Sequence, residues 1–292
     1  MGDSYLAKRL NWLKQTQNSD GGWGYFPHKQ SWLEPTVYAA LALHGTPQSD
    51  KAAQLVEGWQ GADGAWRPAA EVEVATSGTS LALTLAAYRQ EFGPGVQKGV
   101  TWLLGNSGEE TGLKNWIVTH LGLFKPDRDV NIKGWPWKPG TSAWVEPTAR
   151  ALVALKRLSN KFPSKTLQGR VNDGESQLLN TRCADGGWNY GAPAALGINL
   201  PSYPETTALA LAGLQGKPVE EALNGAERML AETPSPLARA WLTISLRLNG
   251  RNPHDLSGDP SQDVMITALE ALSAREGNYR AFLTVAYNGG AA

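Results

Sequence analysis

Three glutamates recur at the same place in an internal repeat, where an acidic side chain could donate or accept a proton. Glu34, Glu146 and Glu205 each lie two residues before a threonine. Glu34 follows Trp23 by 11 residues and Glu146 follows Trp135 by 11, whereas the copy that ends at Glu205 is six residues longer. Because matched positions of a repeat occupy equivalent places in the fold, we expect the three carboxyl groups to lie near one another.

Aromatic side chains accompany the glutamates in the same register. One aromatic residue lies two residues before each glutamate and another two residues after each preceding tryptophan: Trp32, Trp144, Tyr203, Tyr25, Trp137 and Tyr190. His28 lies in the first of these segments. We predict that the glutamates are catalytic and that the six aromatic residues and His28 bind substrate.

Three kinds of ligand suit carboxylates surrounded by aromatic rings. A carboxylic acid can protonate an alkene, and the aromatic faces then stabilise the carbocation or bind a quaternary ammonium group. A sugar also stacks on such rings and is hydrolysed by paired carboxylates. In the structural alternative, each glutamate caps its helix and each aromatic residue packs between repeats.

The tryptophans end a phrase that recurs along the chain. It reads Gln-x-x-Asp-Gly-Gly-Trp at 17–23 and Gln-x-x-Asp-Gly-x-Trp at 60–66, with Arg in place of Gln at 182–188 and a degenerate copy at 134–137. Glycine lets the chain turn sharply, and aspartate can accept hydrogen bonds from backbone N–H groups in the turn. We interpret the phrase as a structural device that follows one helix and precedes another.

The helices flanking the phrase are of two kinds. Amphipathic helices are predicted at 5–15, 50–58, 95–105, 173–181 and 218–231, and apolar helices at 35–44, 77–89, 147–158, 205–215 and 236–249. A helix that is apolar on most faces is buried on most faces. Residues 114–124, 262–274 and 277–288 are also predicted to be helical, and no strand is expected. We predict an all-α protein, a closed ring of about six inner and outer helix pairs.

The phrase resembles the QW motif of squalene-hopene cyclases, oxidosqualene cyclases and related class II terpene cyclases. The run Thr-Ala-Leu-Ala-Leu at 207–211 is similar to the inner helices of that superfamily, which includes the β subunits of protein prenyltransferases. The resemblance covers residues 4 to about 275. It implies an α/α toroid, one domain over residues 1–292, with an apolar central cavity for an isoprenoid-like ligand.

The chain departs from that superfamily at the residues that carry its chemistry. The Asp-x-Asp-Asp acid motif of class II cyclases is absent, and alignment on the threonine that follows it puts its middle aspartate at Glu34, Glu146 and Glu205. Cys183 lacks the Asp-x-Cys pattern of the zinc prenyltransferases, and the four histidines show no ligand spacing. The sequence also has no aspartate-rich magnesium motif. We therefore expect neither a metal nor another cofactor.

Composition limits the partners and the compartment. The 292 residues carry a net charge of zero, which gives no indication of nucleic acid or an anionic membrane as the main partner. One cysteine excludes an internal disulfide. No apolar run approaches the roughly 18 residues of a membrane span, and the charged first residues do not resemble a signal peptide. We expect a soluble cytoplasmic protein, although a chain whose leader had been removed would look the same.

Three functions compete on this evidence. The first is a terpene cyclase-like enzyme that acts on an isoprenoid or another apolar substrate through a carboxylic acid. The second is a non-catalytic toroid that binds an apolar ligand or a partner protein. The third is a carbohydrate-active toroid, a lyase or hydrolase, which needs carboxylates about 5–10 Å apart along an open groove.

Overall fold

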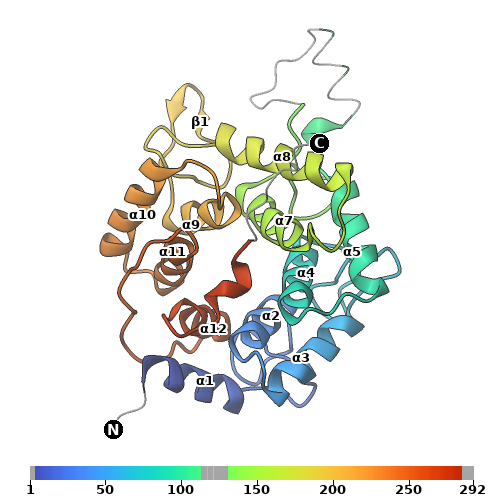
Figure 1. Cartoon of the computed structure of the whole chain (residues 1–292), viewed down its shortest axis with the longest axis vertical. Coiled ribbons are helices and arrows are strands. Elements are labelled where there is room, and N and C mark those ends of the chain that lie inside the picture. Colours follow the sequence, from blue (N-terminus) through green and yellow to red (C-terminus); the bar gives the residue numbers. More distant parts are fainter. Residues whose placement is uncertain (1–3, 113–116, 118–120, 122–130, 285–292) are drawn as a thin grey trace.

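Six apolar helices form a closed inner ring in the computed structural model, which describes residues 4–112, 117, 121 and 131–284. They are α2 (Leu33–Ala42), α4 (Gly78–Arg89), α7 (Val145–Leu158), α9 (Pro204–Gly213), α11 (Pro236–Leu248) and α12 (Val264–Ser273). Each packs on the next, and α12 packs on α2, so the ring closes (Figure 1). Their alanine and leucine side chains are almost all buried, because neighbours cover most of each helix.

The outer layer has one helix fewer than the inner ring within the described residues. It consists of α1 (Tyr5–Gln15), α3 (Pro47–Gly58), α5 (Pro94–Gly105), α8 (Lys165–Asn180) and α10 (Glu220–Glu232). Between α10 and α1 the irregular segment 249–263 covers the ring, with Arg251 paired to Glu220 of α10 and Asp259 to Lys8 of α1. The predicted all-α ring of about six pairs is confirmed, with one outer helix replaced by a loop.

Two short elements differ from the sequence prediction. The segment expected to be helical at 277–288 forms only the 3-10 turn η2 (Tyr279–Phe282) within the described residues, and a similar turn, η1, spans Glu109–Thr111. A small hairpin of β1 (Ala194–Ala195) and β2 (Ile198–Asn199) occupies the insertion in the fourth copy, where no strand was expected. The helix predicted at 114–124 lies outside the described residues, apart from 117 and 121.

A hydrogen bond explains the 13-residue interval between tryptophan and threonine. The backbone N–H of Trp23 donates to the hydroxyl of Thr36 over 2.9 Å. The same bond joins Trp66 to Thr79, Trp135 to Thr148 and Trp188 to Thr207, at 2.9–3.0 Å. It ties the turn after each outer helix to the first turn of the next inner helix, and the six-residue insertion before Thr207 leaves it intact.

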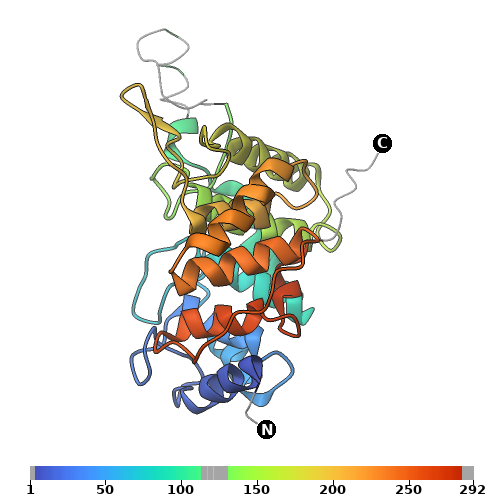
Figure 2. The same cartoon turned by 90° about the vertical axis from the view of Figure 1, so that its left-hand side faces the viewer.

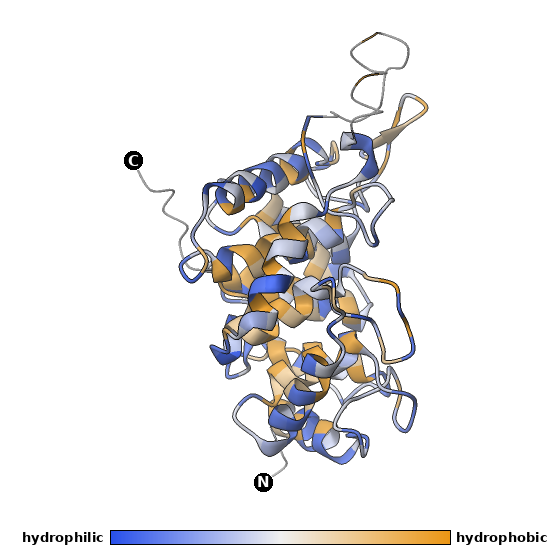
Figure 3. Cartoon of the chain, turned by 90° about the vertical axis from the view of Figure 1, so that its right-hand side faces the viewer, coloured by the Kyte–Doolittle hydropathy of each residue, from blue (hydrophilic) through white to orange (hydrophobic). Residues whose placement is uncertain are grey.

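The inner helices all begin on one face, which we call the mouth; it consists of the loops 24–32, 67–77, 136–144 and 189–203. Figure 2 shows these loops together on one side of the helices, and Figure 3 shows the apolar residues gathered mainly in the helices. Backbone bonds join neighbouring loops in series: Val264 to Tyr25, Leu33 to Pro68, Ser77 to Trp137 and Val145 to Tyr190, at 2.8–3.0 Å from N–H to carbonyl. Each acceptor lies two residues after a repeat tryptophan.

The opposite end of the ring, which we call the floor, is closed by residues 278–284. Figure 1 shows η2 in red at the centre of the ring. Phe282 is buried against Trp241 and Tyr38, with ring centroids 5.3 and 6.3 Å away. The side chain of Asn278 donates to the carbonyls of Leu41 and Ala42 at the end of α2. The C-terminal segment therefore covers the ends of the inner helices.

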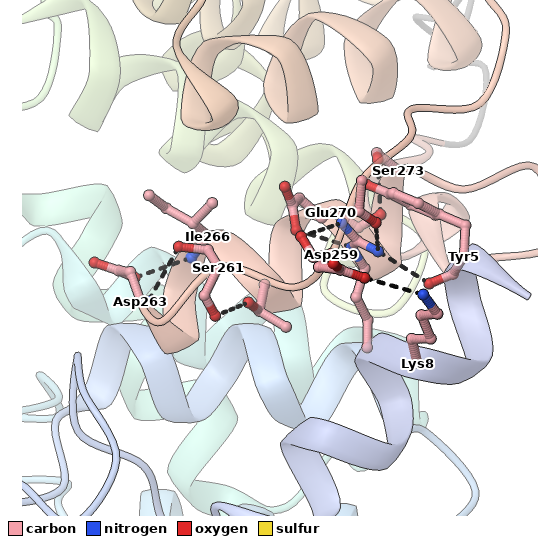
Figure 4. A network of polar contacts seen from close by, with 11 residues as sticks. Tyr5, Lys8, Asp259, Ser261, Asp263, Ile266, Glu270 and Ser273 are labelled. Atoms are coloured by element: carbon pink, nitrogen blue, oxygen red, sulfur yellow. Dashed lines mark hydrogen bonds and ion pairs between the residues drawn. The ribbon is translucent and has the colours of Figure 1, made fainter. Parts of the chain in front are cut away.

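The first and last helices are joined by buried charges (Figure 4). Arg9 of α1 is fully buried and its Nε lies 2.8 Å from Glu270 of α12. Arg9 also donates to the carbonyls of Gly258 and Asp259, and Asp259 pairs with Lys8 at 2.9 Å. These contacts hold α1 over α12 and close the ring. Among the described residues, no helix is long and apolar enough to cross a membrane.

Candidate functional site

Two of the three predicted carboxyl groups meet at one arginine on the mouth side of the ring. Arg150 lies one helical turn after Glu146 on α7, and its Nη2 is 2.5 Å from an oxygen of Glu146 and 2.5 Å from an oxygen of Glu34 on α2. The two carboxylate oxygens are therefore at most 5.0 Å apart. A single positive charge thus contacts two carboxyl groups and can balance only one negative charge, which favours a proton on the other carboxyl group.

The surroundings distinguish the two acids. Burial raises the pKa of Glu146, the charge of Glu34 raises it further, and Arg150 only partly opposes them. Burial alone would lower the pKa of Arg150, but Glu146, Tyr38 and Glu34 raise it overall, so the guanidinium stays charged. Glu34 also accepts a hydrogen bond of 2.9 Å from the hydroxyl of Tyr25. Burial raises the pKa of that phenol, and it remains a donor.

The third glutamate lies in another part of the mouth. Glu205 accepts a hydrogen bond of 3.2 Å from the hydroxyl of Ser235. Tyr190 and Tyr203 are exposed, with ring centroids 5.5 Å apart. The expected approach of three carboxyl groups is therefore found for Glu34 and Glu146, while Glu205 makes a separate contact. The catalytic roles of all three remain predictions.

A pocket of about 280 Å³ opens at the mouth beside Glu34 and Arg150. Aromatic side chains on its wall are Tyr25, Trp32 and Trp137, and Lys138 lies at its edge. Its lining includes Glu34 but not Glu146. Its volume lies just below the usual range of about 300–1,000 Å³ for small-molecule sites, which favours a compact ligand.

The other predicted binding residues do not line this pocket. Trp144 is half-buried and precedes α7, where its N–H bonds to the carbonyl of Trp135 over 3.1 Å. His28 is exposed in the first mouth loop with a φ of 62°, a conformation uncommon for residues other than glycine. The pocket is thus lined by residues of the first, second and third copies, and by none of the fourth.

The central cavity implied by the family resemblance is nearly filled. An apolar chamber lies on the inner surfaces of the ring, with Arg150, Leu81, Leu209, Trp241 and Phe282 among its lining residues. Its volume is about 20 Å³, which is room for about one water molecule. The structure therefore does not confirm a ligand-sized central cavity, because Trp241 and Phe282 line the chamber and fill most of it.

Sequence reasoning missed Arg150, which organises the site. Two residues after each repeat threonine come Tyr38, Leu81, Arg150 and Leu209. Three of them line the chamber and the fourth packs beside it. The sequence does contain a signal for it. Arg150 occupies a position that is apolar or aromatic in the other copies, and it lies four residues after Glu146, which indicates a buried ion pair. Charged residues seldom occupy a buried helix face without a partner.

The described residues offer no evident metal centre. Within 4–112 and 131–284, no group of three or more His, Cys, Asp or Glu side chains could hold an ion. Cys183 is buried, and burial raises the pKa of its thiol, which disfavours the reactive thiolate. The expectation that the protein uses no cofactor stays a prediction.

Comparison with known proteins identifies the fold. No family model matches the sequence, and no curated protein matches it. Among solved structures, the type II terpene cyclase MstE from Scytonema is similar over 92% of this chain and 96% of its own, with a TM-score of 0.57 and 16% identity. Endoglucanase Cel10 of Klebsiella pneumoniae, a family 8 glycosyl hydrolase, is similar over 91% and 97%, with a TM-score of 0.61 and 14% identity. A protein from Actinoplanes gives 0.54 at 19% identity, over 91% of this chain and 78% of its own. The chain therefore has the α/α toroid fold found in terpene cyclases and family 8 hydrolases.

Proposed function

We propose that the protein is a terpene cyclase-like enzyme that protonates a short isoprenoid alkene in the mouth pocket. The observation that carries the proposal is the pairing of Glu34 and Glu146 on the single cation of Arg150. Two carboxyl groups this close ionise as a coupled pair. Burial raises the pKa of Glu146 and the charge of Glu34 adds to this, so Glu146 keeps a proton at a pH where an isolated glutamate would lose it.

In this mechanism Glu34 delivers the proton, because it lines the pocket and Glu146 does not. The carboxyl O–H bond breaks as a C–H bond forms on the alkene, which leaves a carboxylate and a carbocation. The π faces of Tyr25, Trp32 and Trp137 stabilise the cation. The cation closes a ring by attack of a second alkene, and loss of a proton to the carboxylate restores the acid. Arg150, which also contacts Glu146, holds Glu34 in position through its ion pair.

The substrate is expected to be shorter than that of the structural neighbour. One MstE structure holds geranylgeranyl dihydroxybenzoate as substrate. Here the mouth pocket is about 280 Å³ and the central chamber is nearly filled, so a long polyprenyl chain has no room along the axis. We expect a compact isoprenoid and no cofactor, within a single toroid domain in the cytoplasm.

Deuterium incorporation tests acid catalysis directly. The protein is incubated in D2O with geraniol, farnesol and geranylgeraniol, and products are analysed by gas chromatography and mass spectrometry. We expect a cyclised product that carries one deuterium on carbon. The Glu34→Gln and Glu146→Gln variants should lose it, whereas Glu205→Gln, which lies outside the arginine pair, should retain it. Substrates that bind but stay unchanged in wild type would instead favour a non-catalytic binding toroid.

A second candidate function is hydrolysis of a short glycoside. Carboxylate oxygens at most 5.0 Å apart are compatible with the spacing of retaining glycosidases, and the exposed rings of Trp137, Tyr190 and Tyr203 could stack on sugars. Against it, Arg150 lies between the acids and occupies the space that a glycosidic bond needs. Release of reducing sugar from cello-oligosaccharides, lost in Glu34→Gln, would establish this function in place of the first.

A further inference from the structure

A groove of about 710 Å³ lies on the outer wall of the ring, between the outer helices α3 and α5 and over the inner helix α4. Figure 1 shows α3 and α5 as neighbours in the outer layer, with α4 inside them. The groove shares no lining residue with the mouth pocket. Its volume lies within the range of about 300–1,000 Å³ that is usual for small-molecule sites.

One wall of the groove carries a buried hydrogen-bond donor without an acceptor. Trp66 lines the groove and is 4% exposed, and its indole N–H finds no partner in the part of the chain that the structure describes. In the other three copies the same N–H donates to a carbonyl of the preceding outer helix over 2.6–2.9 Å: Trp23 to Leu13, Trp135 to Leu103 and Trp188 to Leu178. A buried donor left unpaired is costly, so a bound group that accepts this bond would be favoured.

The orientation of the indole follows from its contact with α5. A Cβ atom at Gly99 of α5 would lie 2.4 Å from Cζ3 of Trp66, so this edge of the ring faces α5. Cζ3 and Nε1 lie on opposite sides of an indole. The N–H of Trp66 therefore points away from α5, toward the α3 side of the groove.

A small residue on α4 opens the base of the groove. Seven residues after the repeat threonine the second copy has Ala86, whereas the other copies have leucines that are at most 2% exposed: Leu43, Leu155 and Leu214. The neighbouring Leu85 is larger than its counterparts, and it lines the groove without filling it. Together with Ala82 these residues give the groove an apolar base.

The charged residues of the groove leave an excess of negative charge. Arg89 pairs with Asp50 over 3.0 Å and with Glu91 over 2.9 Å. Glu57 also lines the groove, is exposed, and makes no ion pair within the described residues. Three acids thus face one base, and Glu57 is the acid that is free to bind a cation.

We propose that this groove is a second ligand site, which binds a small amphiphilic amine. The apolar part of the ligand covers Ala86 and its neighbours, the ammonium group pairs with Glu57, and a carbonyl or similar oxygen accepts the N–H of Trp66. A peptide strand suits the groove less well, because helices form its walls and offer no sheet edge for a strand to pair with. The proposal concerns a separate site and stands independently of the proposed catalysis.

NMR of protein with isotope-labelled tryptophan tests the proposal with lidocaine, which combines a tertiary ammonium, an amide carbonyl and an apolar ring. The signal of Trp66 is assigned as the indole N–H signal that is lost in Trp66→Phe. We expect it to move downfield and to saturate as lidocaine is added, because a hydrogen bond deshields the indole proton. The acetyl analogue of lidocaine, which lacks the amine, should bind more weakly.

Two variants test the walls of the groove. Ala86→Leu restores the residue of the other copies, fills the base, and should weaken lidocaine binding at least tenfold without lowering the melting temperature. Glu57→Gln should weaken it about fivefold, as expected for one exposed ion pair. The matched controls are Ala231→Leu and Glu232→Gln at exposed positions of α10, which should bind lidocaine like wild type.

Three outcomes would overturn the proposal. One is the absence of a saturable shift of the Trp66 signal in wild type at millimolar lidocaine. Another is equal affinity in Ala86→Leu and Ala231→Leu, since filling the groove would then have no effect. The third is a shift of Trp32 and Trp137 without one of Trp66, which would place the ligand in the mouth pocket.

Discussion

The two ends of the inner ring are built from different interactions, although the same six helices form both. At the mouth, helix N-termini, carboxyl groups and one arginine surround an open pocket. At the floor, a segment of the chain packs an aromatic ring into the axis and bonds to helix-end carbonyls. The repeated residues thus determine how the helices are arranged, while residues outside the repeated pattern determine which end of the ring is open.

Helix α7 contains one arginine at each end, which allows a matched comparison. Arg150 near the mouth pairs with two carboxylates. Arg157, two turns later at the floor, donates to the carbonyls of Arg280 and Leu283 at 3.1 and 2.6 Å. The same substitution at the two positions therefore removes a cation from between two carboxylates at the mouth, and a donor to neutral backbone carbonyls at the floor.

Arg150→Met should give the largest effect, a loss of about 3–5 kcal/mol in the free energy of unfolding at pH 7, because it removes the buried cation that contacts both Glu34 and Glu146. Urea denaturation measures it. The loss should shrink when the pH is lowered to about 4, since protonation removes the repulsion. A loss below about 1 kcal/mol at pH 7 would show that the carboxyl groups are already neutral or solvated.

Phe282→Ala should cost about 3 kcal/mol, which is typical of removing a buried aromatic ring and leaving a cavity. The cavity would join the 20 Å³ chamber and stay apolar. Benzene should therefore raise the melting temperature of the variant and leave that of wild type unchanged. If benzene affects both proteins equally, Phe282 is not the residue that limits space on the axis.

Arg157→Met should cost about 1 kcal/mol, because its acceptors at the floor are backbone carbonyls that water can reach. The measurement is the same urea denaturation as for Arg150→Met, and the ratio of the two losses is the informative quantity. Equal losses would remove the contrast between a charge cluster at the mouth and neutral bonds at the floor.

The sequence predicts the arrangement of the helices better than the contacts at the mouth and the floor of the ring. The apolar inner helices and the tryptophan–threonine interval could be read directly, because the same bond from a tryptophan N–H to a threonine hydroxyl recurs in four copies. The filled axis could not be predicted, because Phe282 comes from outside the repeated pattern and approaches from a distant part of the chain. The pairing of Glu34 with Arg150 required knowledge of which helices are neighbours across 116 residues.

Glu146→Gln should give the smallest effect, visible as a change with pH. Burial raises the pKa of Glu146 above its ordinary value, so the folded protein binds more protons than the unfolded chain between the two values. Stability from this group is fully present below the ordinary pKa and is lost as the pH rises through the raised one. Glutamine resembles the protonated acid and avoids this loss. The melting temperature of Glu146→Gln relative to wild type should therefore increase between pH 4 and pH 7.

The same comparison in a Glu34→Gln background separates the causes. Burial of Glu146 remains in that background, but the repulsion from Glu34 is gone, and the guanidinium of Arg150 has one carboxylate in place of two. In that background, the increase with pH in the melting temperature of Glu146→Gln, relative to the protein that keeps Glu146, should therefore be smaller. If the protein that keeps Glu146 instead becomes the more stable of the two as the pH rises, Glu146 is stabilised as a carboxylate by Arg150. The mouth would then hold a pair of fixed anions and no acid.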